Sequence, residues 1–260
     1  MHRTFYVSVN GHKSKTFHIL AGVPQGSVLS PTLYNVFTSD LKITHSEKAF
    51  FADDSCLYLS ARSPKKIVKK LNAAGKQLTD FATKWKIKLN ESKTNSAFFT
   101  RRTAQKWLPS EGITVRDSKI VWSNSIKYLG STLDKTLTFK TNTDLISDKA
   151  HMYLGMLYPI INRKSKLSSS NKLLIFRAII QSILLNACPV WGNCAYHHIE
   201  KLQIIQNKCL KIILNLPRYH STYDLHHRAN IPKLSQQISK INLNFRAKLA
   251  RSENPLINNL

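Results

Sequence analysis

Two pairs of short apolar runs near the start of the chain predict β-hairpins. Residues 5–9 alternate between apolar and polar positions, Asn10-Gly11 follows as a turn signal, and residues 16–19 resume the alternation. Further along, the apolar runs 49–52 and 56–60 are separated by three polar residues. Because the runs have the length of strands and the separation is short, we expect a second hairpin there.

Proline next to a capping residue marks the start of two helices. Ser30 stands before Pro31 and predicts a helix that runs to about Leu41, and Ser63-Pro64 repeats the signal. The second helix carries apolar residues at spacings of three and four, which predicts one buried face. The residues of this stripe are Ile67, Leu71, Ala74, Leu78, Phe81 and Trp85.

The pattern changes from strands to helices near residues 135–140. Strand-like pieces lie at residues 95–100, 113–115, 119–122 and 126–133. Helical patterns follow at residues 139–163, 168–187, 197–215 and 233–251. The sequence therefore predicts an α+β protein, with an antiparallel sheet in residues 1–137 and mostly helices in residues 138–260.

Charge is the unusual property of the composition. The chain has 260 residues with 39 Lys and Arg against 14 Asp and Glu, which gives a net charge of +25. Hydrophobic residues make up 42% of the chain, which is typical of a folded protein. This composition excludes a disordered tail. This charge favours a phosphate-rich partner. The alternative is a basic piece of a larger, better balanced protein.

Much of this charge lies on and after the second predicted helix. From Arg62 to Arg102 there are 12 Lys and Arg, against only Asp80 and Glu91. The helical lysines avoid the apolar stripe, so we expect them to contact nucleic-acid phosphates, and the alternative is a face that is merely solvated. The residues expected to contact the backbone are Arg62, Lys65, Lys66, Lys69 and Lys70.

The sequence offers little support for disulfides, zinc or a membrane. Four cysteines are too few and too unevenly placed for a disulfide framework. The most apolar stretch, residues 173–191, is interrupted by polar residues, and no signal peptide is recognisable, so we expect a soluble intracellular protein without a membrane partner. No zinc is expected, because the usual knuckle spacing is absent from Cys188, Cys194, His197, His198 and Cys209.

The first feature that suggests chemistry is the pair Asp53-Asp54 between the strands of the second hairpin. Adjacent carboxylates repel each other unless something neutralises them. Hard oxygen ligands of this kind favour Mg²⁺. The alternative is a solvated turn, because Asp favours turns by itself.

Two motifs in this order resemble the palm of a reverse transcriptase: AGVPQGSVLSP at residues 21–31 and FADD at residues 51–54. The resemblance is to reverse transcriptases of non-long-terminal-repeat retrotransposons, closest to the jockey-like elements of insects. It implies that Asp53 and Asp54 carry catalytic Mg²⁺, with Mn²⁺ as an alternative. It also implies that a loop lies beside the incoming nucleotide and the template, formed by Gly22, Pro24, Gln25, Gly26 and Ser27.

The resemblance continues through most of the chain. The segment Trp85–Thr94 is similar to the next palm motif, which implies a catalytic role for Lys93 near the triphosphate, as a charge stabiliser or as a proton donor to pyrophosphate. The alternative for Lys93 is a solvated lysine. Tyr128, Leu129 and Gly130 are similar to the primer grip. Residues 1–137 would then be a partial palm and residues 138–260 a helical thumb or connection-like region.

The resemblance implies an RNA-directed DNA polymerase. In the complete enzyme, a primer 3′-hydroxyl attacks the α-phosphorus of a deoxynucleoside triphosphate by two-metal catalysis. The expected partners are an RNA template, a DNA primer, target DNA and the nucleotide, and the nucleus fits such an element. Two alternatives stay open: a non-catalytic remnant that binds nucleic acid, and a domesticated interaction module that uses the helical half.

One departure from the family's pattern concerns the metal site. Members carry another metal-binding aspartate on a strand upstream of the glycine loop. Here the 21 residues before Gly22 contain no Asp or Glu. Two metal ions need carboxylates from both sides to offset their repulsion. We therefore expect a C-terminal fragment of a polymerase that is inactive by itself.

Overall fold

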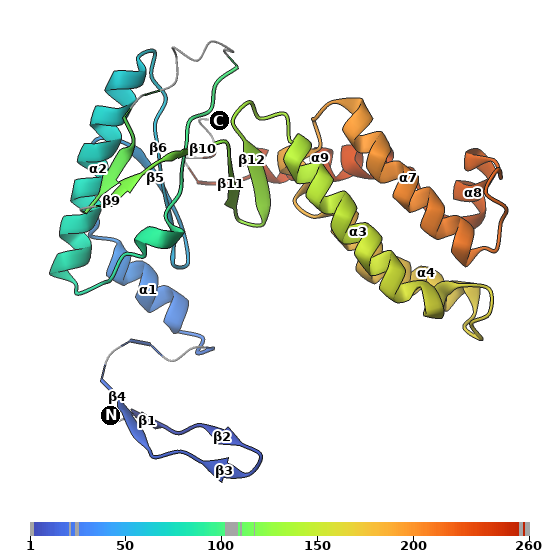
Figure 1. The fold of residues 1–260 in the computed structure, drawn as a ribbon, viewed down its shortest axis with the longest axis horizontal. Helices are drawn as coiled ribbons and strands as arrows, with labels where there is room; N and C mark the ends of the chain where they lie inside the picture. The colour runs from blue at the N-terminus through green and yellow to red at the C-terminus, as the bar shows by residue number, and fades with distance from the viewer. Residues whose placement is uncertain are drawn as a thin grey trace. The chain divides into compact units, whose positions relative to one another are not determined.

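The structure is a computed structural model, and it describes residues 3–20, 22–23, 26–101, 109, 111–116, 118–254 and 257. The chain divides into two compact units (Figure 1). The N-terminal unit comprises Met1–Thr94 and Ala104–Val121, and the helical unit comprises Asn95–Thr103 and Trp122–Leu260. The mixture of helices and small, mainly antiparallel sheets confirms the predicted α+β class. The division into palm and thumb at residue 137 stays a prediction.

The N-terminal unit begins with the predicted hairpin. The outer strands β1 (Arg3–Phe5) and β4 (Phe17–Ile19) pair antiparallel, and so do the inner strands β2 (Ser8–Val9) and β3 (His12–Lys13). Asn10-Gly11 forms the turn with φ angles of 49° and 83°. Positive φ at both central residues suits the right-handed twist of the strands, which explains the Asn-Gly sequence.

Helix α1 (Ser30–Thr38) is shorter than predicted, and its cap is different. The first helical hydrogen bond runs from the backbone N–H of Leu33 to the carbonyl of Leu29 at 2.9 Å. Leu29 therefore occupies the N-cap position, and Ser30 is already helical. The helix ends at Thr38 instead of Leu41, and the Ser39 hydroxyl donates to the Val36 carbonyl at 2.7 Å as its last turn closes.

Helix α2 (Pro64–Lys84) starts after Ser63 as predicted, with Pro64 in its first turn. Its buried residues include Ile67 and Ala74 of the predicted stripe. Trp85 was expected on the buried face but is 42% exposed. It lies at the C-cap, where its ring packs edge-on against Phe37 with the ring centroids 5.1 Å apart.

Two short hairpins complete the N-terminal unit. Strands β5 (Glu47–Phe51) and β6 (Asp54–Tyr58) form the second predicted hairpin, and α2 lies beside it (Figure 1). Strands β8 (Ile113–Val115) and β9 (Ser118–Ile120) form a third pair that packs on α2. There the Asn72 amide oxygen accepts from the Thr114 backbone N–H at 2.8 Å.

The helical unit opens with four short strands. Strands β11 (Ser125–Tyr128) and β12 (Ser131–Asp134) form an antiparallel hairpin, whereas β7 (Ser96–Ala97) and β10 (Trp122–Ser123) pair in parallel. The parallel pair departs from the predicted antiparallel sheet. It is only two residues long, and Phe98 packs edge-on against Trp122 beside it, with ring centroids 5.9 Å apart.

Helices make up the rest of this unit. In chain order they are α3 (Lys140–Ile161), α4 (Ser169–Ile175), the π-helical turn η3 (Phe176–Gln181), α5 (Ser182–Leu185), α6 (Cys188–Trp191), α7 (Tyr196–Ile213), α8 (Thr222–Ala229) and α9 (Leu234–Ala250). The predicted helix over 168–187 is therefore interrupted by a π-helical turn, and α8 was not predicted. In the described part of the chain, no helix is both long and apolar enough to span a bilayer.

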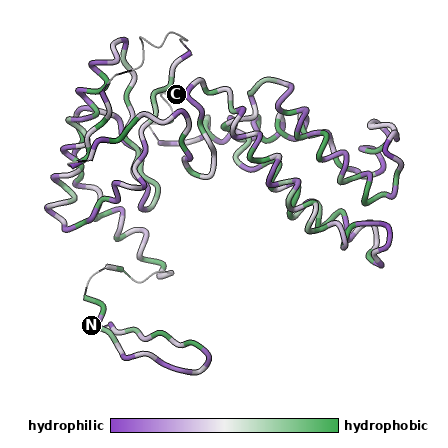
Figure 2. Tube along the Cα trace, viewed as in Figure 1, coloured by the Kyte–Doolittle hydropathy of each residue, from purple (hydrophilic) through white to green (hydrophobic). Residues whose placement is uncertain are grey.

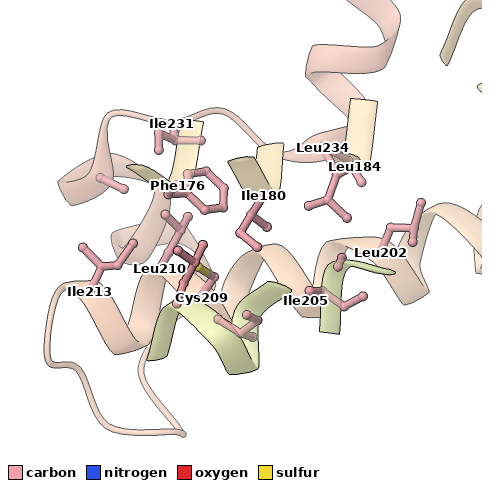
Figure 3. Packing of buried hydrophobic residues seen from close by; sticks show 14 of the residues in the cluster. Phe176, Ile180, Leu184, Leu202, Ile205, Cys209, Leu210, Ile213, Ile231 and Leu234 are labelled. Carbon is pink, nitrogen blue, oxygen red and sulfur yellow. The ribbon is translucent and has the colours of Figure 1, made fainter. Parts of the chain in front are cut away.

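The helical unit has a large apolar core, to which η3 contributes Phe176 and Ile180 and α7 contributes Leu202 and Leu210 (Figure 3). Apolar and polar residues alternate along these helices (Figure 2), as expected for elements with one buried face. Trp191 is fully buried, and its indole N–H donates to the Asn186 carbonyl at 2.8 Å. The polar atom of the largest side chain in the core, the indole nitrogen of Trp191, therefore has a hydrogen-bond partner.

Candidate functional site

The Asp53-Asp54 pair lies at the tip of the β5–β6 hairpin. Phe51 pairs with Asp54 as the last rung, so Ala52 and Asp53 form a two-residue turn. Ala52 has a φ of 50°, a conformation that tight hairpin turns require. Both carboxylates are exposed. Strand pairing therefore presents two adjacent negative charges where a ligand can reach them.

The donor chemistry of this tip fits a hard divalent cation, because two carboxylates offer up to four oxygen ligands. In the described residues, however, no group of three or more His, Cys, Asp or Glu side chains is placed to hold a metal ion. Glu47 lies at the opposite end of the same hairpin, paired with Tyr58. Asp53 and Asp54 would thus supply part of a coordination shell.

The predicted nucleotide loop is described in part. Gly22 and Gly26 have φ angles of 86° and 84°, which side chains rarely adopt, and a Cβ at either position would meet open space. The glycines are therefore required by backbone conformation and not by crowding. The Gly22 carbonyl accepts from the Arg3 guanidinium at 2.5 Å, and the Ser27 carbonyl accepts from the Ser30 N–H at 3.2 Å. Pro24 and Gln25 lie outside the described residues.

Lys93 ends the short 3₁₀ turn η1 (Glu91–Lys93) and is exposed. The Asn90 side chain caps this turn: its oxygen accepts from the Ser92 hydroxyl at 2.7 Å and from the Lys93 N–H at 3.3 Å. Glu91 pairs with Arg116 at 3.9 Å. The turn is therefore held by its own cap and by the strand pair β8–β9, and it belongs to the same unit as the carboxylate hairpin.

The predicted basic residues of α2 lie on its exposed side. These residues are all exposed, and we call them the lysine face: Arg62, Lys65, Lys66, Lys69 and Lys70. Three of its lysines, with His45 and Ala73, line an open groove of about 440 Å³. Because four lysines lie in the first two turns of α2 and Arg62 lies just before them, the surface there is strongly positive. Its role in binding stays a prediction.

The predicted primer grip is the turn of the β11–β12 hairpin in the helical unit. Leu129 and Gly130 have φ angles of 45° and 82°, and Tyr128 pairs with Ser131 on either side of them. Leu129 is a non-glycine residue in a left-handed conformation at an exposed turn. The backbone of Leu129 is therefore strained, and the role of this turn as a primer grip stays a prediction.

Asp134 was assigned no role from the sequence, and it holds the end of this hairpin to the connection that leads into α3. Its Oδ1 accepts from the backbone N–H of Thr138 at 2.9 Å and of Thr136 at 3.2 Å, and from both hydroxyls. Burial raises the pKa of Asp134, but the hydrogen bonds from Thr138 and Thr136 outweigh it and hold the pKa below its ordinary value. The spacing Asp-x-Thr-x-Thr is the signal that could have identified it.

The cysteines considered for zinc lie among the helices. Cys188 and Cys209 are buried in the core, and burial raises the pKa of Cys209 to about 12. Burial also raises the pKa of Cys194. Buried cysteines of this kind commonly act as small apolar residues of a core.

Residues 1–133, just over half of the chain, match the protein family described as "Reverse transcriptase (RNA-dependent DNA polymerase)". These residues include the glycine loop, the carboxylate hairpin, the lysine face and Lys93. The match therefore covers the positions that the sequence motifs indicated in the N-terminal unit.

Individual relatives extend the similarity along nearly the whole chain. It is 32% identical over 267 residues to the RNA-directed DNA polymerase from mobile element jockey of Drosophila melanogaster, and 30% identical over 262 residues to the probable enzyme from transposon X-element of the same species. These alignments cover 99% and 98% of this chain, but only 29% and 28% of the relatives. The predicted resemblance to jockey-like polymerases is confirmed, and the chain belongs to the reverse transcriptase family.

Proposed function

We propose that the chain provides the carboxylate hairpin and helical region of an RNA-directed DNA polymerase that extends a DNA primer on an RNA template. The observation that carries this proposal is the exposed Asp53-Asp54 pair at the tip of the β5–β6 hairpin, inside the segment matched to reverse transcriptases. A buried or hydrogen-bonded pair of aspartates could hold a turn together. An exposed pair at a hairpin tip is free to meet a cation and a triphosphate.

Reverse transcriptases typically use a divalent metal ion, which supplies charge neutralisation at the reacting phosphate and activates the attacking hydroxyl when it is bound. In this proposal Asp53 and Asp54 hold Mg²⁺ or Mn²⁺. The loop from Gly22 to Ser27 lets its backbone approach the nucleotide, because two glycines with positive φ leave open space. Lys93 stabilises charge on the departing pyrophosphate or gives it a proton.

The nucleic acid is held by other parts of the chain. Residues 1–137 act as part of the palm, with the lysine face along the backbone of the template–primer duplex. The turn at Tyr128, Leu129 and Gly130 positions the primer end, since Gly130 leaves room for a phosphate. Residues 138–260 act as the thumb. The partners are therefore RNA template, DNA primer or target DNA, and deoxynucleoside triphosphates.

A chimera tests this proposal, because the chain spans under a third of the length of its relatives. The 260 residues replace the matching segment of the jockey polymerase, and primer extension is measured on a primed RNA template with Mg²⁺ or Mn²⁺. We expect extension by the chimera and none above background in Asp53→Ala. A second chimera carries only residues 47–58, so that a misfolded long exchange does not decide the result. Extension that survives Asp53→Ala in either chimera would overturn the proposal.

A further inference from the structure

The segment that joins α7 to α8 presents two aromatic rings to solvent. Tyr219 is 91% exposed and Tyr223 is 81% exposed. Tyr219 lies in the connection, and Tyr223 is the second residue of α8. Neither ring contributes to the core of the helical unit. Both faces of each ring are therefore largely available to a planar ligand.

The backbone under these rings is firmly held. The His220 N–H donates to the Pro217 carbonyl at 3.0 Å, and the Lys211 ammonium donates to the Arg218 carbonyl at 2.6 Å. Leu225, two residues after Tyr223, is fully buried. A braced connection loses little conformational entropy when it binds, so exposed rings on it are prepared for contact.

An acid at the centre of the segment is already neutralised. Asp224 contacts the His220 ring at 2.5 Å and the Arg228 guanidinium at 2.7 Å. The hydrogen bond from His220, together with the charge of Arg228, holds the pKa of Asp224 below its ordinary value. The negative charge of Asp224 is therefore paired with Arg228 at the surface, which reduces its repulsion of an anionic ligand.

The remaining charge around the rings is positive. Between residues 211 and 233 the sequence has one acid, Asp224, which pairs with Arg228. The other Lys and Arg residues of this segment are Lys211, Arg218 and Lys233. Arg218 is exposed directly beside Tyr219. Exposed aromatic rings alternating with cations suit a ligand that carries planar bases on an anionic backbone. An acidic protein surface would satisfy the cations but would leave the rings without stacking partners.

We propose that this segment binds single-stranded nucleic acid, with bases stacked on Tyr219 and Tyr223 and a phosphate contacted by Arg218. Base faces are accessible only in an unpaired strand, so a duplex is not the ligand. The site goes beyond the proposed polymerase function. Binding at this site requires no metal ion and no deoxynucleoside triphosphate. It also does not depend on Asp53 or on the lysine face.

Fluorescence anisotropy on the whole chain tests the stacking. The probes are labelled oligouridylate and oligothymidylate of about twelve nucleotides, a length within the range of one binding site. Tyr219→Leu and Tyr223→Leu should each raise the Kd about fivefold or more, because each removes one stacking surface. The double variant should raise the Kd about 25-fold. The double Phe variant keeps the rings and should bind like the parent. Tyr196→Leu is the matched control, an exposed tyrosine of the same unit that should leave the Kd unchanged.

Two further probes separate stacking from charge and RNA from DNA. An abasic strand of the same length keeps the phosphates, so the parent and the double Leu variant should bind it equally. A duplex should likewise be bound equally by both. Similar losses for oligouridylate and oligothymidylate would support recognition of bases in either nucleic acid, and a loss confined to one would assign the site to that one. If the double Leu variant binds both single strands as tightly as the parent, or if the double Phe variant binds as weakly as the Leu variant, the proposal fails.

Discussion

The two units differ in what holds them together and in what they expose. Among the described residues, the core of the helical unit contains 19 buried apolar residues, and seven others are buried elsewhere, all in the N-terminal unit. The N-terminal unit instead carries the exposed Asp53-Asp54 pair and the lysine face. The residues that stabilise most of this chain are therefore not the residues that carry its family motifs.

This difference predicts that stability and chemistry respond to different substitutions. Packing defects should act mainly in the helical unit, because each buried side chain there loses many contacts when it is truncated. Substitutions in the N-terminal unit that change a charge or remove a glycine should alter ligand binding more than the free energy of unfolding. The reason is that exposed residues contribute little to stability. Each prediction below can break or sharpen that comparison.

The largest effect on folding is expected for Trp191→Ala. The side chain is fully buried and donates a hydrogen bond to the Asn186 carbonyl. Its loss should lower the free energy of unfolding by about 3–5 kcal/mol, measured by chemical denaturation with the helical circular dichroism signal. Val190→Ala is the control, since Val190 is 52% exposed and should cost under about 0.5 kcal/mol. Equal effects at the two positions would contradict the described core.

The lysine face should dominate the salt dependence of binding. Replacing Lys65, Lys66, Lys69 and Lys70 with Gln should reduce the slope of log K against log [salt] by up to about four, measured with duplex and hybrid probes. The same four positions changed to Arg should keep the slope, because the charge is kept. A slope that the Gln variant does not change would mean that this helix face is only solvated.

A smaller effect is expected in the glycine loop. Gly26 has a φ of 84°, so Gly26→Val imposes backbone strain of about 1–3 kcal/mol at that position. In the active chimera this should raise the KM for nucleotide and leave affinity for nucleic acid nearly unchanged. Gly26→Asn should retain more activity, because Asn tolerates positive φ. If Val and Asn are equally active, the conformation of this glycine is irrelevant to nucleotide use.

The smallest expected effect is a pH dependence of the helical unit. Burial lowers the pKa of His226, whose ring nitrogens contact the Ile231 carbonyl at 2.7 Å and the Asn207 amide oxygen at 2.9 Å. Burial and the neighbouring His197 lower the pKa of His198. Because the pKa of each histidine is lower in the folded chain than in the unfolded chain, the unfolded chain binds a proton more readily below about pH 6.5. The stability that is present above about pH 6.5 is therefore lost as the pH falls through the folded pKa.

Denaturation measured between about pH 7.5 and about pH 5 should therefore show decreasing stability, by at most about 1.4 kcal/mol per pH unit for each histidine. His226→Gln cannot gain a charge and should reduce this decrease. His227→Gln, at the exposed neighbour, should leave it unchanged. Stability that rises as the pH falls would contradict the buried neutral histidine.

Local signals predicted the turns better than the connections between elements. Asn10-Gly11 forms the predicted turn because the turn conformation depends on the residues in it. The second turn was predicted at Asp53-Asp54-Ser55 but lies at Ala52-Asp53, since Asp54 and Ser55 already pair in β6. Helix α8 was missed because it has eight residues and a largely polar sequence. The parallel pairing of β7 with β10 joins segments far apart in the chain, which short-range patterns do not record.

The same limit applies to the candidate site. The spacing of motifs indicated Gly26, Asp53 and Asp54, and the structure supplies the reason for the glycine in its φ angle. Asp134 was given no role, since its four hydrogen bonds to two threonines form only when the chain turns into α3. Tyr219 and Tyr223 became informative only through their exposure, which sequence patterns do not give.

The most direct test of the central claim is single-turnover primer extension by the jockey chimera with Asp53→Asn. This change keeps the size of the side chain and removes its charge, so the rate should fall about a thousandfold or more, while affinity for the primed RNA template changes little. Glu47→Gln, at the other end of the same hairpin, is the matched control and should extend like the parent chimera. If Asp53→Asn extends as fast as Glu47→Gln, Asp53 does not take part in catalysis and the account is wrong.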